Sequence, residues 1–342
     1  CSFLSDPKSH DQENRIEVIT THAARIFLSD TMAYKIKLPV KYDYLDFSTL
    51  GRRKAVCERE LEINKPHAPM IYESVVAIRQ SDDGQLSFNG RGPPVEWAIK
   101  MHRFPESNIL LRLARRGELS RDIGRRLGHK IAQYHLGLAP TDTQDGSLRI
   151  SEIIDELKRE FAELHEFIDE KQQHDYFNKI RLEIDAVGHK LDQRAQAGMI
   201  RRCHGDMHLR NLVMLDDQPT LFDALEFDER LATTDILYDL AFLLMDMRHE
   251  KLHQQSNDTF NRYILEAWTL VERSGFAVMP LFLSIRAAIR AMVSAQTGLR
   301  APNKLQQQKI EARRYFSQAV EFLRFTQPQL VICAGFSGSG KS

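Results

Sequence analysis

Alternation of apolar and polar positions over the first hundred residues predicts a small β-sheet. Short β-prone segments lie at 16–20, 25–28, 33–37, 71–78 and 95–101. In the third segment Tyr34 and Ile36 share one face, and Lys35 and Lys37 share the other. One helix is predicted at 49–64, because Ser48 or Thr49 can cap it and prolines at 66 and 69 stop it.

From Ser107 onward the apolar spacing changes to that of helices. Ser120 caps an amphipathic helix in which Ile123, Leu127 and Ile131 form one stripe. Further helices are predicted at 109–116, 151–171, 176–196, 236–245, 281–293 and 304–325. Arg286 and Arg290 lie four apart on the helix at 281–293, and we expect them to be exposed or paired with acids.

Two polar clusters lie in the middle of this helical part. The first is His204-Gly205-Asp206-Met207-His208-Leu209-Arg210-Asn211, and the second is Phe222-Asp223. Apolar segments at 212–214 and 221–222 flank a predicted turn at 216–219, so a hairpin would bring Asn211 close to Asp223. Phosphoryl transfer needs one carboxylate to orient the attacking hydroxyl, here Asp206. It also needs an amide oxygen and a second carboxylate to hold magnesium, here Asn211 and Asp223.

A lysine that contacts nucleotide phosphates is also needed, and the sheet offers two. Lys35 is favoured over Lys37 because it directly follows Ala33-Tyr34 in its strand. An acid on the helix at 49–64 would pair with this lysine, and Glu60 is the first choice, with Glu58 second. The segment at 101–105 follows the last predicted strand and is the place where backbone groups would bind adenine.

The polar clusters have two other interpretations. Asp and Asn are common in turns, and D-x-x-x-x-N occurs often by chance. His204 and His208 have the spacing of two zinc ligands on one helix face, but Gly205 is a poor helix residue and no Glu follows His204. The order of strands, turn and acids therefore favours phosphotransfer, with the two histidines in a supporting role.

Bulk composition excludes several classes. The formal net charge is zero, so no general attraction to nucleic acid or to an anionic membrane is expected. The four cysteines are scattered without a C-x-x-C pair, which indicates reduced thiols in the cytoplasm. No signal peptide is visible, and the chain begins at Cys1.

The C-terminal end has a second nucleotide motif. An apolar strand is predicted at 330–334, and the following eight residues fit G-x-x-x-x-G-K-S from Gly335 to Gly340, Lys341 and Ser342. Backbone N–H groups of such a P-loop bind phosphates, the lysine reaches the β- and γ-oxygens, and the serine binds magnesium. We therefore expect a P-loop domain to begin at about residue 327 and to continue in a longer protein.

Residues of about 15 to 325 resemble the aminoglycoside phosphotransferase and choline kinase superfamily. The closest matches are the stretches at 33–40, 44–50 and 222–227. The order of features is similar to a bacterial fusion family with a C-terminal P-loop kinase-like ATPase domain. This resemblance implies an α+β, two-lobed protein-kinase-like fold, with a β-rich N-lobe at 1–104 and a helical C-lobe at 105–326 that contains a substrate-side insert at about 151–198. It also implies Asp206 as the catalytic residue, Asn211 and Asp223 as metal ligands, and Lys35 on the phosphates.

Departures from protein kinases favour a small-molecule acceptor. Gly205 replaces the arginine that receives an activation-loop phosphate, Ala224-Leu225 follows Asp223, and no G-x-G-x-x-G covers the phosphates. Backbone and hydroxyl groups at 20–22 or 29–31 would cover them instead. The predicted function is ATP- and Mg²⁺-dependent transfer to a small-molecule hydroxyl. The alternative is a pseudokinase that senses nucleotide and regulates the attached P-loop domain, and a protein kinase is disfavoured.

Overall fold

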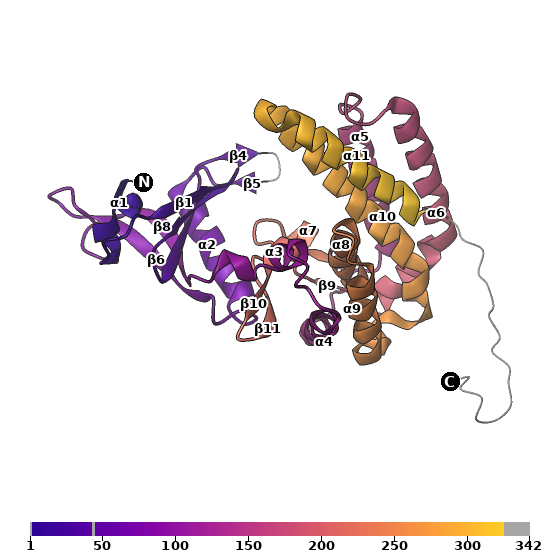
Figure 1. Cartoon of the computed structure of the whole chain (residues 1–342), viewed down its shortest axis with the longest axis horizontal. Helices are drawn as coiled ribbons and strands as arrows, with labels where there is room; N and C mark the ends of the chain where they lie inside the picture. Colours follow the sequence, from indigo (N-terminus) through magenta and orange to yellow (C-terminus); the bar gives the residue numbers. More distant parts are fainter. Residues whose placement is uncertain (1, 43–44, 325–342) are drawn as a thin grey trace.

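The computed structural model describes residues 2–42 and 45–324. A β-rich lobe formed by the first hundred residues lies beside a larger helical lobe (Figure 1). The strand predicted at 330–334 and the P-loop residues Gly335, Gly340, Lys341 and Ser342 lie outside the described residues.

An antiparallel sheet forms the β-rich lobe, in the order β1-β2-β3-β8-β6-β7. Its strands are β1 (Glu17–Thr20), β2 (Ala24–Leu28), β3 (Met32–Lys37), β6 (Tyr72–Gln80), β7 (Leu86–Phe88) and β8 (Pro94–His102). The five predicted strands are confirmed within two residues at each end, and β7 was not predicted. A short hairpin of β4 (Lys41–Tyr42) and β5 (Leu45–Asp46) was also not predicted, because two-residue strands have no measurable period.

The two faces of the sheet differ as the alternation predicted. Tyr34 and Ile36 pack into an apolar cluster with Leu4 of α1 (Ser2–Ser5), which precedes the short helix η1 (Pro7–His10). The other face is covered by α2 (Leu50–Asn64), which packs against β6 and β8. Thr49 caps α2 by accepting a hydrogen bond from the backbone N–H of Arg52.

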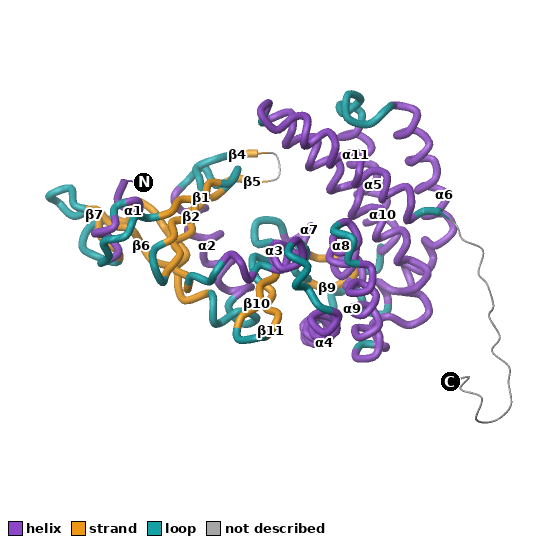
Figure 2. Tube along the Cα trace, in the orientation of Figure 1, coloured by secondary structure: helices purple, strands orange, loops and turns teal. Residues whose placement is uncertain are grey.

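Helices dominate the second lobe, and its strands are confined to short pairs near the junction (Figure 2). The strand pairs are β9 (Ile200–Arg202) with β12 (Thr233–Asp235), and β10 (Leu212–Leu215) with β11 (Gln218–Leu221). The main helices are α4 (Arg121–Gly137), α5 (Gly146–Phe161), α6 (Glu170–Gln196), α8 (Ile236–His249), α9 (His253–Glu266), α10 (Trp268–Arg300) and α11 (Leu305–Phe322). Short helices complete it: η2 (Glu106–Asn108), α3 (Leu110–Arg115), η3 (Leu209–Asn211), α7 (Glu229–Ala232) and η4 (Pro302–Lys304).

Two local predictions need correction. The helix predicted at 151–171 ends at Phe161, because Leu164 and Phe167 turn into the core and Asp169 caps α6 instead. The predicted four-residue turn of the hairpin is a two-residue turn at Asp216 and Asp217, both with positive φ, and strand β11 already begins at Gln218.

Helix α10 is longer than the predicted 281–293. It contains a non-helical residue, Glu272, and continues through Pro280. The part Ser274–Arg300 has the length and a mean hydropathy of 1.7 that a membrane span would need. Because 56% of the apolar window is buried inside the protein, we interpret it as a core helix. The expectation that Arg286 and Arg290 are exposed or paired with acids was wrong, since Arg286 lies against Tyr238 of α8 and Arg290 against Tyr315 of α11.

Candidate active site

Helix α8 holds the loop at 203–211, called the catalytic loop below, at two points. The carboxylate of Asp239 accepts hydrogen bonds from the backbone N–H groups of His204 (3.2 Å) and Gly205 (2.8 Å). Two turns later, Asp246 accepts one from the N–H of Leu209 at 3.0 Å. Residues seven apart lie on the same helix face, so a single face of α8 fixes both ends of the loop.

Gly205 allows the loop to turn sharply. Its φ is +80°, and a Cβ atom there would lie 3.0 Å from the Cβ of Leu225 and 3.4 Å from the Cα of Ala232. Both the backbone conformation and the crowding exclude larger side chains. This explains why an arginine does not fit at the position where protein kinases carry one.

Asp206 is held from both sides. The amide nitrogen of Asn211 donates to its carboxylate at 2.8 Å and to its backbone carbonyl at 3.0 Å. The Nε2 atom of His208 lies 3.4 Å from the same carboxylate oxygen. His204 bonds the carbonyl of Phe222 at 3.0 Å, which ties the loop to the end of the hairpin.

Asp223 follows the hairpin with a φ of +59°, a conformation that Asp tolerates better than most residues. Its N–H donates to the hydroxyl of Tyr72 at 3.1 Å, and the next N–H, of Ala224, donates to Oδ1 of Asn64 at 2.8 Å. The N–H of Phe222 donates to the carbonyl of Asn211 at 3.1 Å. The hairpin is therefore confirmed, and it brings the backbones of the two predicted metal ligands together.

The lysines of β3 form a buried network of charges with acids from both lobes. Lys35 lies 2.9 Å from Glu60 and 2.6 Å from Asp223. Lys37 lies 2.5 Å from the other oxygen of Glu60 and also pairs with Glu226. The predicted pairing of Lys35 with Glu60 is confirmed, whereas Glu58 pairs with Lys54 on the helix surface. Glu60 itself is fully buried.

Burial and nearby charges shift the pKa values of these groups in opposite directions. Burial would raise the pKa of Asp206, but His208 and His204 hold it well below its usual range. Burial acts the same way on Asp223, where Lys35 keeps the pKa low. Although burial alone would lower the pKa of Lys35, Asp223 and Glu60 raise it well above the usual value. All three groups are therefore charged near neutral pH.

The donors at the catalytic loop suit magnesium. Because the nitrogen of Asn211 is engaged by Asp206, its amide oxygen and the carboxylate of Asp223 remain as hard oxygen donors, which Mg²⁺ prefers. A zinc site at His204 and His208 has no support, since their ring nitrogens bond the backbone and Asp206. Among described residues, the group close enough to hold a metal is His135, Cys203 and Asp239.

That buried group has a structural explanation. His135 bonds the hydroxyl of Tyr263 at 2.9 Å and Asp239 at 3.2 Å, so both of its ring nitrogens are engaged. Burial raises the pKa of Cys203 well above its usual value, which disfavours the thiolate form that a metal requires. These side chains position Asp239 and hence the catalytic loop.

The two turns predicted to cover the phosphates, at 20–22 and 29–31, lie at opposite ends of the strands. The N–H of Arg103, just after β8, donates to the carbonyl of Thr31 at 2.8 Å, so the turn at 29–31 lies beside the predicted adenine-binding segment. The turn at 20–22 lies at the other end of the strands, where Ala24 pairs with Lys37. The turn at 20–22 is therefore the one beside the lysine and acid network.

Four residues that the pattern of the sequence did not single out complete the site: Asn64, Tyr72, Glu226 and Asp239. Tyr72 holds the backbone of Asp223, Asn64 holds that of Ala224, and Asp239 holds the catalytic loop. Asp239 had one usable signal, a lone acid in an apolar helix, which must be paired when it is buried. The roles of the other three depend on tertiary contacts.

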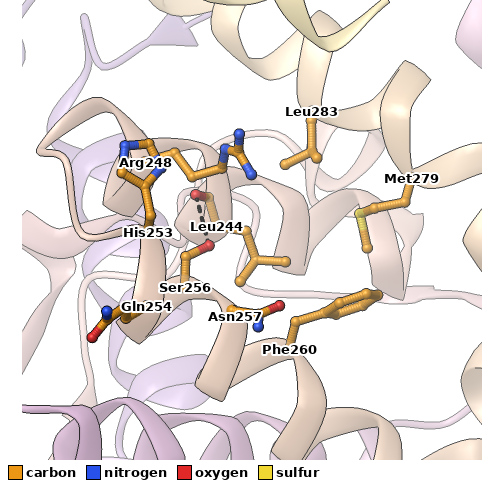
Figure 3. A pocket seen from close by; sticks show the side chains of 9 residues that line it. All are labelled: Leu244, Arg248, His253, Gln254, Ser256, Asn257, Phe260, Met279 and Leu283. Atoms are coloured by element: carbon orange, nitrogen blue, oxygen red, sulfur yellow. Dashed lines mark hydrogen bonds between the residues drawn. The ribbon is translucent and has the colours of Figure 1, made fainter. Parts of the chain in front are cut away.

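A cavity of about 330 Å³ lies apart from this site, between α8, α9 and α10 (Figure 3). Its lining includes Leu244, Ser256, Phe260 and Met279, and no catalytic-loop residue. The hydroxyl of Ser256 is already used by the carbonyl of Leu244 at 3.3 Å. This cavity therefore adds nothing to the chemistry of the catalytic loop.

The arrangement of catalytic loop, hairpin and lysine network agrees with the comparison with known families. The phosphotransferase enzyme family matches residues 102–274, just over half of the chain, and this range includes Asp206, Asn211 and Asp223. The chain belongs to the phosphotransferase enzyme family.

Sequence relatives of this chain include uncharacterized proteins of Mycobacterium tuberculosis and Mycobacterium bovis. Each is 25% identical to it over 335 residues, which cover 96% of this chain. The chain spans 64% of the length of these relatives.

Solved structures show the same fold at low identity. A choline/ethanolamine kinase family protein from Mesorhizobium loti has a TM-score of 0.50 at 12% identity, covering 95% of this chain and 93% of that one. The GDP complex of aminoglycoside 2'-phosphotransferase-IIIa has a TM-score of 0.51 at 14% identity, covering 91% of each chain. A choline kinase from Cryptosporidium parvum has a TM-score of 0.51 at 11% identity, covering 90% and 88%. The kinase-like fold predicted from the sequence is confirmed.

Proposed function

We propose that this phosphotransferase transfers the γ-phosphoryl group of ATP, with Mg²⁺, to a hydroxyl of a small molecule. The observation that supports this most directly is the set of Asp206, Asn211 and Asp223 on two adjoining segments, with Lys35 paired to Glu60 beside them. Positioning and electrostatics account for most of phosphoryl-transfer catalysis, and these residues supply both.

Asp206 would orient the acceptor hydroxyl and take its proton as the oxygen attacks phosphorus. Its low pKa makes it a weak base, so orientation is the larger part of its role. Asn211 and Asp223 would hold magnesium. The chemistry that the bound metal supplies is neutralisation of charge on the phosphate oxygens. Lys35 would move from Asp223 to the phosphates, while Glu60 keeps it in place.

The C-terminal motif supports a second proposal, that the full-length protein fuses this phosphotransferase to a P-loop ATPase domain. Its support is the G-x-x-x-x-G-K-S sequence from Gly335 to Ser342 after an apolar stretch.

We also propose that the protein works in the cytoplasm without binding nucleic acid or membrane. The ATP requirement, the zero formal net charge and the buried free thiols of Cys57 and Cys203 support this.

The test is ADP release with magnesium-ATP across sugars, amino alcohols, sugar acids and aminoglycosides, with Asp223→Ala as the control. We expect acceptor-dependent release that disappears in Asp223→Ala. ATP binding without acceptor-dependent release would contradict the proposal and favour the nucleotide-sensing pseudokinase. Phosphate on protein acceptors alone would favour a protein kinase.

A further inference from the structure

Two arginines of α10 point toward the catalytic part of the helical lobe. Arg286 and Arg290 lie four residues apart, and therefore on one face of the helix. The guanidinium of Arg286 lies 3.8 Å from the ring centroid of Tyr238 and 4.8 Å from that of Phe242. Phe242 in turn contacts the ring of His208 in the catalytic loop. Arg290 lies over the ring of Tyr315.

Neither arginine has a carboxylate oxygen within 4.0 Å in the part of the chain that the structure describes. Arg286 is 6% exposed, its Nε donates to the carbonyl of Tyr238, and its Nη2 atom is buried without a partner. The Nε atom of Arg290 is likewise buried without a partner. The nearby Asp246 already accepts from the N–H of Leu209 and the hydroxyl of Tyr315.

A third arginine lies on the catalytic loop itself. Arg210, four residues after Asp206, is exposed and has no acid within 4.0 Å among described residues. Arg290 lies over the ring of Tyr315, whose hydroxyl donates to Asp246. Asp246 also accepts from the N–H of Leu209, the residue before Arg210, so both arginines lie on the side of this carboxylate.

Gathering unpaired guanidinium groups costs free energy, because like charges repel and each loses hydration. An oxyanion that binds there would recover this cost through charge-assisted hydrogen bonds, and arginine is the side chain best suited to carboxylate and phosphate. A polycationic acceptor would add positive charge to the same region instead.

Helix α5 does not offer a cluster of free acids. Three of its four acids are engaged elsewhere: Glu152 pairs with Arg230 at 2.7 Å, Asp155 with Arg181 at 3.5 Å, and Glu160 accepts from Gln296 at 2.7 Å. Burial raises the pKa of Tyr238 and the fourth acid, Glu156, adds to this, which places Glu156 on the side of Arg286.

We infer that the acceptor of this phosphotransferase carries an anionic group, a carboxylate or phosphate near the reacting hydroxyl, which Arg290 and Arg210 bind and Arg286 supports. This inference rests on the proposed function. It assigns the acceptor to hydroxy acids or phosphorylated sugars and polyols, in place of amino alcohols and aminoglycosides.

The first test compares acceptors of related skeleton and different charge. In the sugar series gluconate and glucose 6-phosphate are anionic, glucose is neutral and glucosamine is cationic. In the small-alcohol series glycerate is anionic, glycerol is neutral and ethanolamine is cationic. We expect the highest kcat/KM with anionic members. Arg290→Gln should lower that value about tenfold or more, mainly by raising KM, because charge-assisted hydrogen bonds are lost. Arg290→Lys should recover part of it. Arg181→Gln, at an exposed position on α6, should behave like wild type.

Highest turnover of neutral or cationic members, or unchanged charge preference in Arg290→Gln, would overturn the inference while leaving the proposed function intact. A second measurement does not depend on the acceptor. Inorganic sulfate is titrated calorimetrically into the protein saturated with Mg²⁺ and a non-hydrolysable ATP analogue, at constant ionic strength. We expect saturable binding that is lost when Arg210→Gln and Arg290→Gln are combined. Absence of binding in wild type, or equal binding in the double variant, would overturn the inference even if no acceptor is turned over.

Discussion

Gly205 occupies a backbone position that an L-amino acid with a side chain fills only under strain. Asp239 holds the N–H of Gly205 and that of His204, and Asp206 follows directly, so a shift here moves the carboxylate of the proposed catalytic residue. The sequence showed this glycine as a departure from protein kinases. The structure gives the physical reason, a φ of +80° beside Leu225 and Ala232.

Gly205→Ala should therefore lower the free energy of unfolding by about 1–2 kcal/mol, the usual cost of a left-handed conformation. Turnover should fall as well, because Asp206 is displaced. The matched control is Gly188→Ala in α6, where the new Cβ would meet only ordinary contact with Ser147 at 3.6 Å. Urea denaturation measures the stability of both variants, and equal stability of Gly205→Ala and Gly188→Ala would contradict this expectation.

Helix α8 shows how one element organises a site that lies outside it. Asp239 and Asp246 are buried acids on an otherwise apolar helix, and each accepts a backbone hydrogen bond from the catalytic loop. Burial raises the pKa of Asp239, but His135 and His204 hold it below its usual value. A folded-state pKa below the unfolded one adds stability above about pH 3.9, which is lost as pH falls through the folded value.

Asp239→Asn should lower the free energy of unfolding at neutral pH by about 1–3 kcal/mol. The reason is that the N–H groups of His204 and Gly205 lose the charged carboxylate that accepts their hydrogen bonds. It should also lower kcat by misplacing the catalytic loop. The stability difference from wild type should shrink as pH falls below 4, where Asp239 in the wild type becomes protonated. Asp185→Asn, at an exposed position on α6, is the control. A difference that stays constant with pH would refute the assigned role of Asp239.

Sequence patterns predicted elements best where the period was long and regular. Strand β3 and helix α2 were predicted nearly to the residue, and the alternation on β3 correctly placed Lys35 opposite Tyr34. Prediction failed where tertiary burial decided the outcome. The charge-rich segment at 151–171 matched a continuous helix, yet Leu164 and Phe167 leave it for the core. Arg286 and Arg290 were expected to be exposed or paired with acids because a sequence does not show which aromatic rings cover a charge.

The two lobes are joined by a charge network whose partners are far apart in sequence. Lys37 of β3 pairs with Glu226, which follows the hairpin, and Glu60 of α2 bonds both strand lysines. Burial raises the pKa of Glu226, and Lys37 only partly offsets this. The pair therefore fixes the loop of Asp223 against the β-rich lobe at some cost in desolvation.

Lys37→Met should be strongly destabilising, by about 3–5 kcal/mol, because it leaves buried acids without their cation. Combining it with Glu226→Gln should cost less than the sum of the two single changes, with a coupling of about 0.5–3 kcal/mol. Urea denaturation of the four proteins in this double-mutant cycle measures the coupling. The exposed pair Lys54 and Glu58 is the control and should show little coupling. Strict additivity for Lys37 and Glu226 would show that their contact does not join the lobes.

We propose that Asp206 acts on the acceptor and Asp223 on the metal. The decisive measurement determines both Mg²⁺-dependent ATP binding and steady-state turnover, with an acceptor that wild type uses, for Asp206→Asn and Asp223→Asn. We expect Asp206→Asn to bind ATP like wild type but to turn over about a hundredfold more slowly, the usual size of base effects. Asp223→Asn should lose the magnesium dependence of binding together with turnover. Wild-type turnover in either variant would exclude these roles.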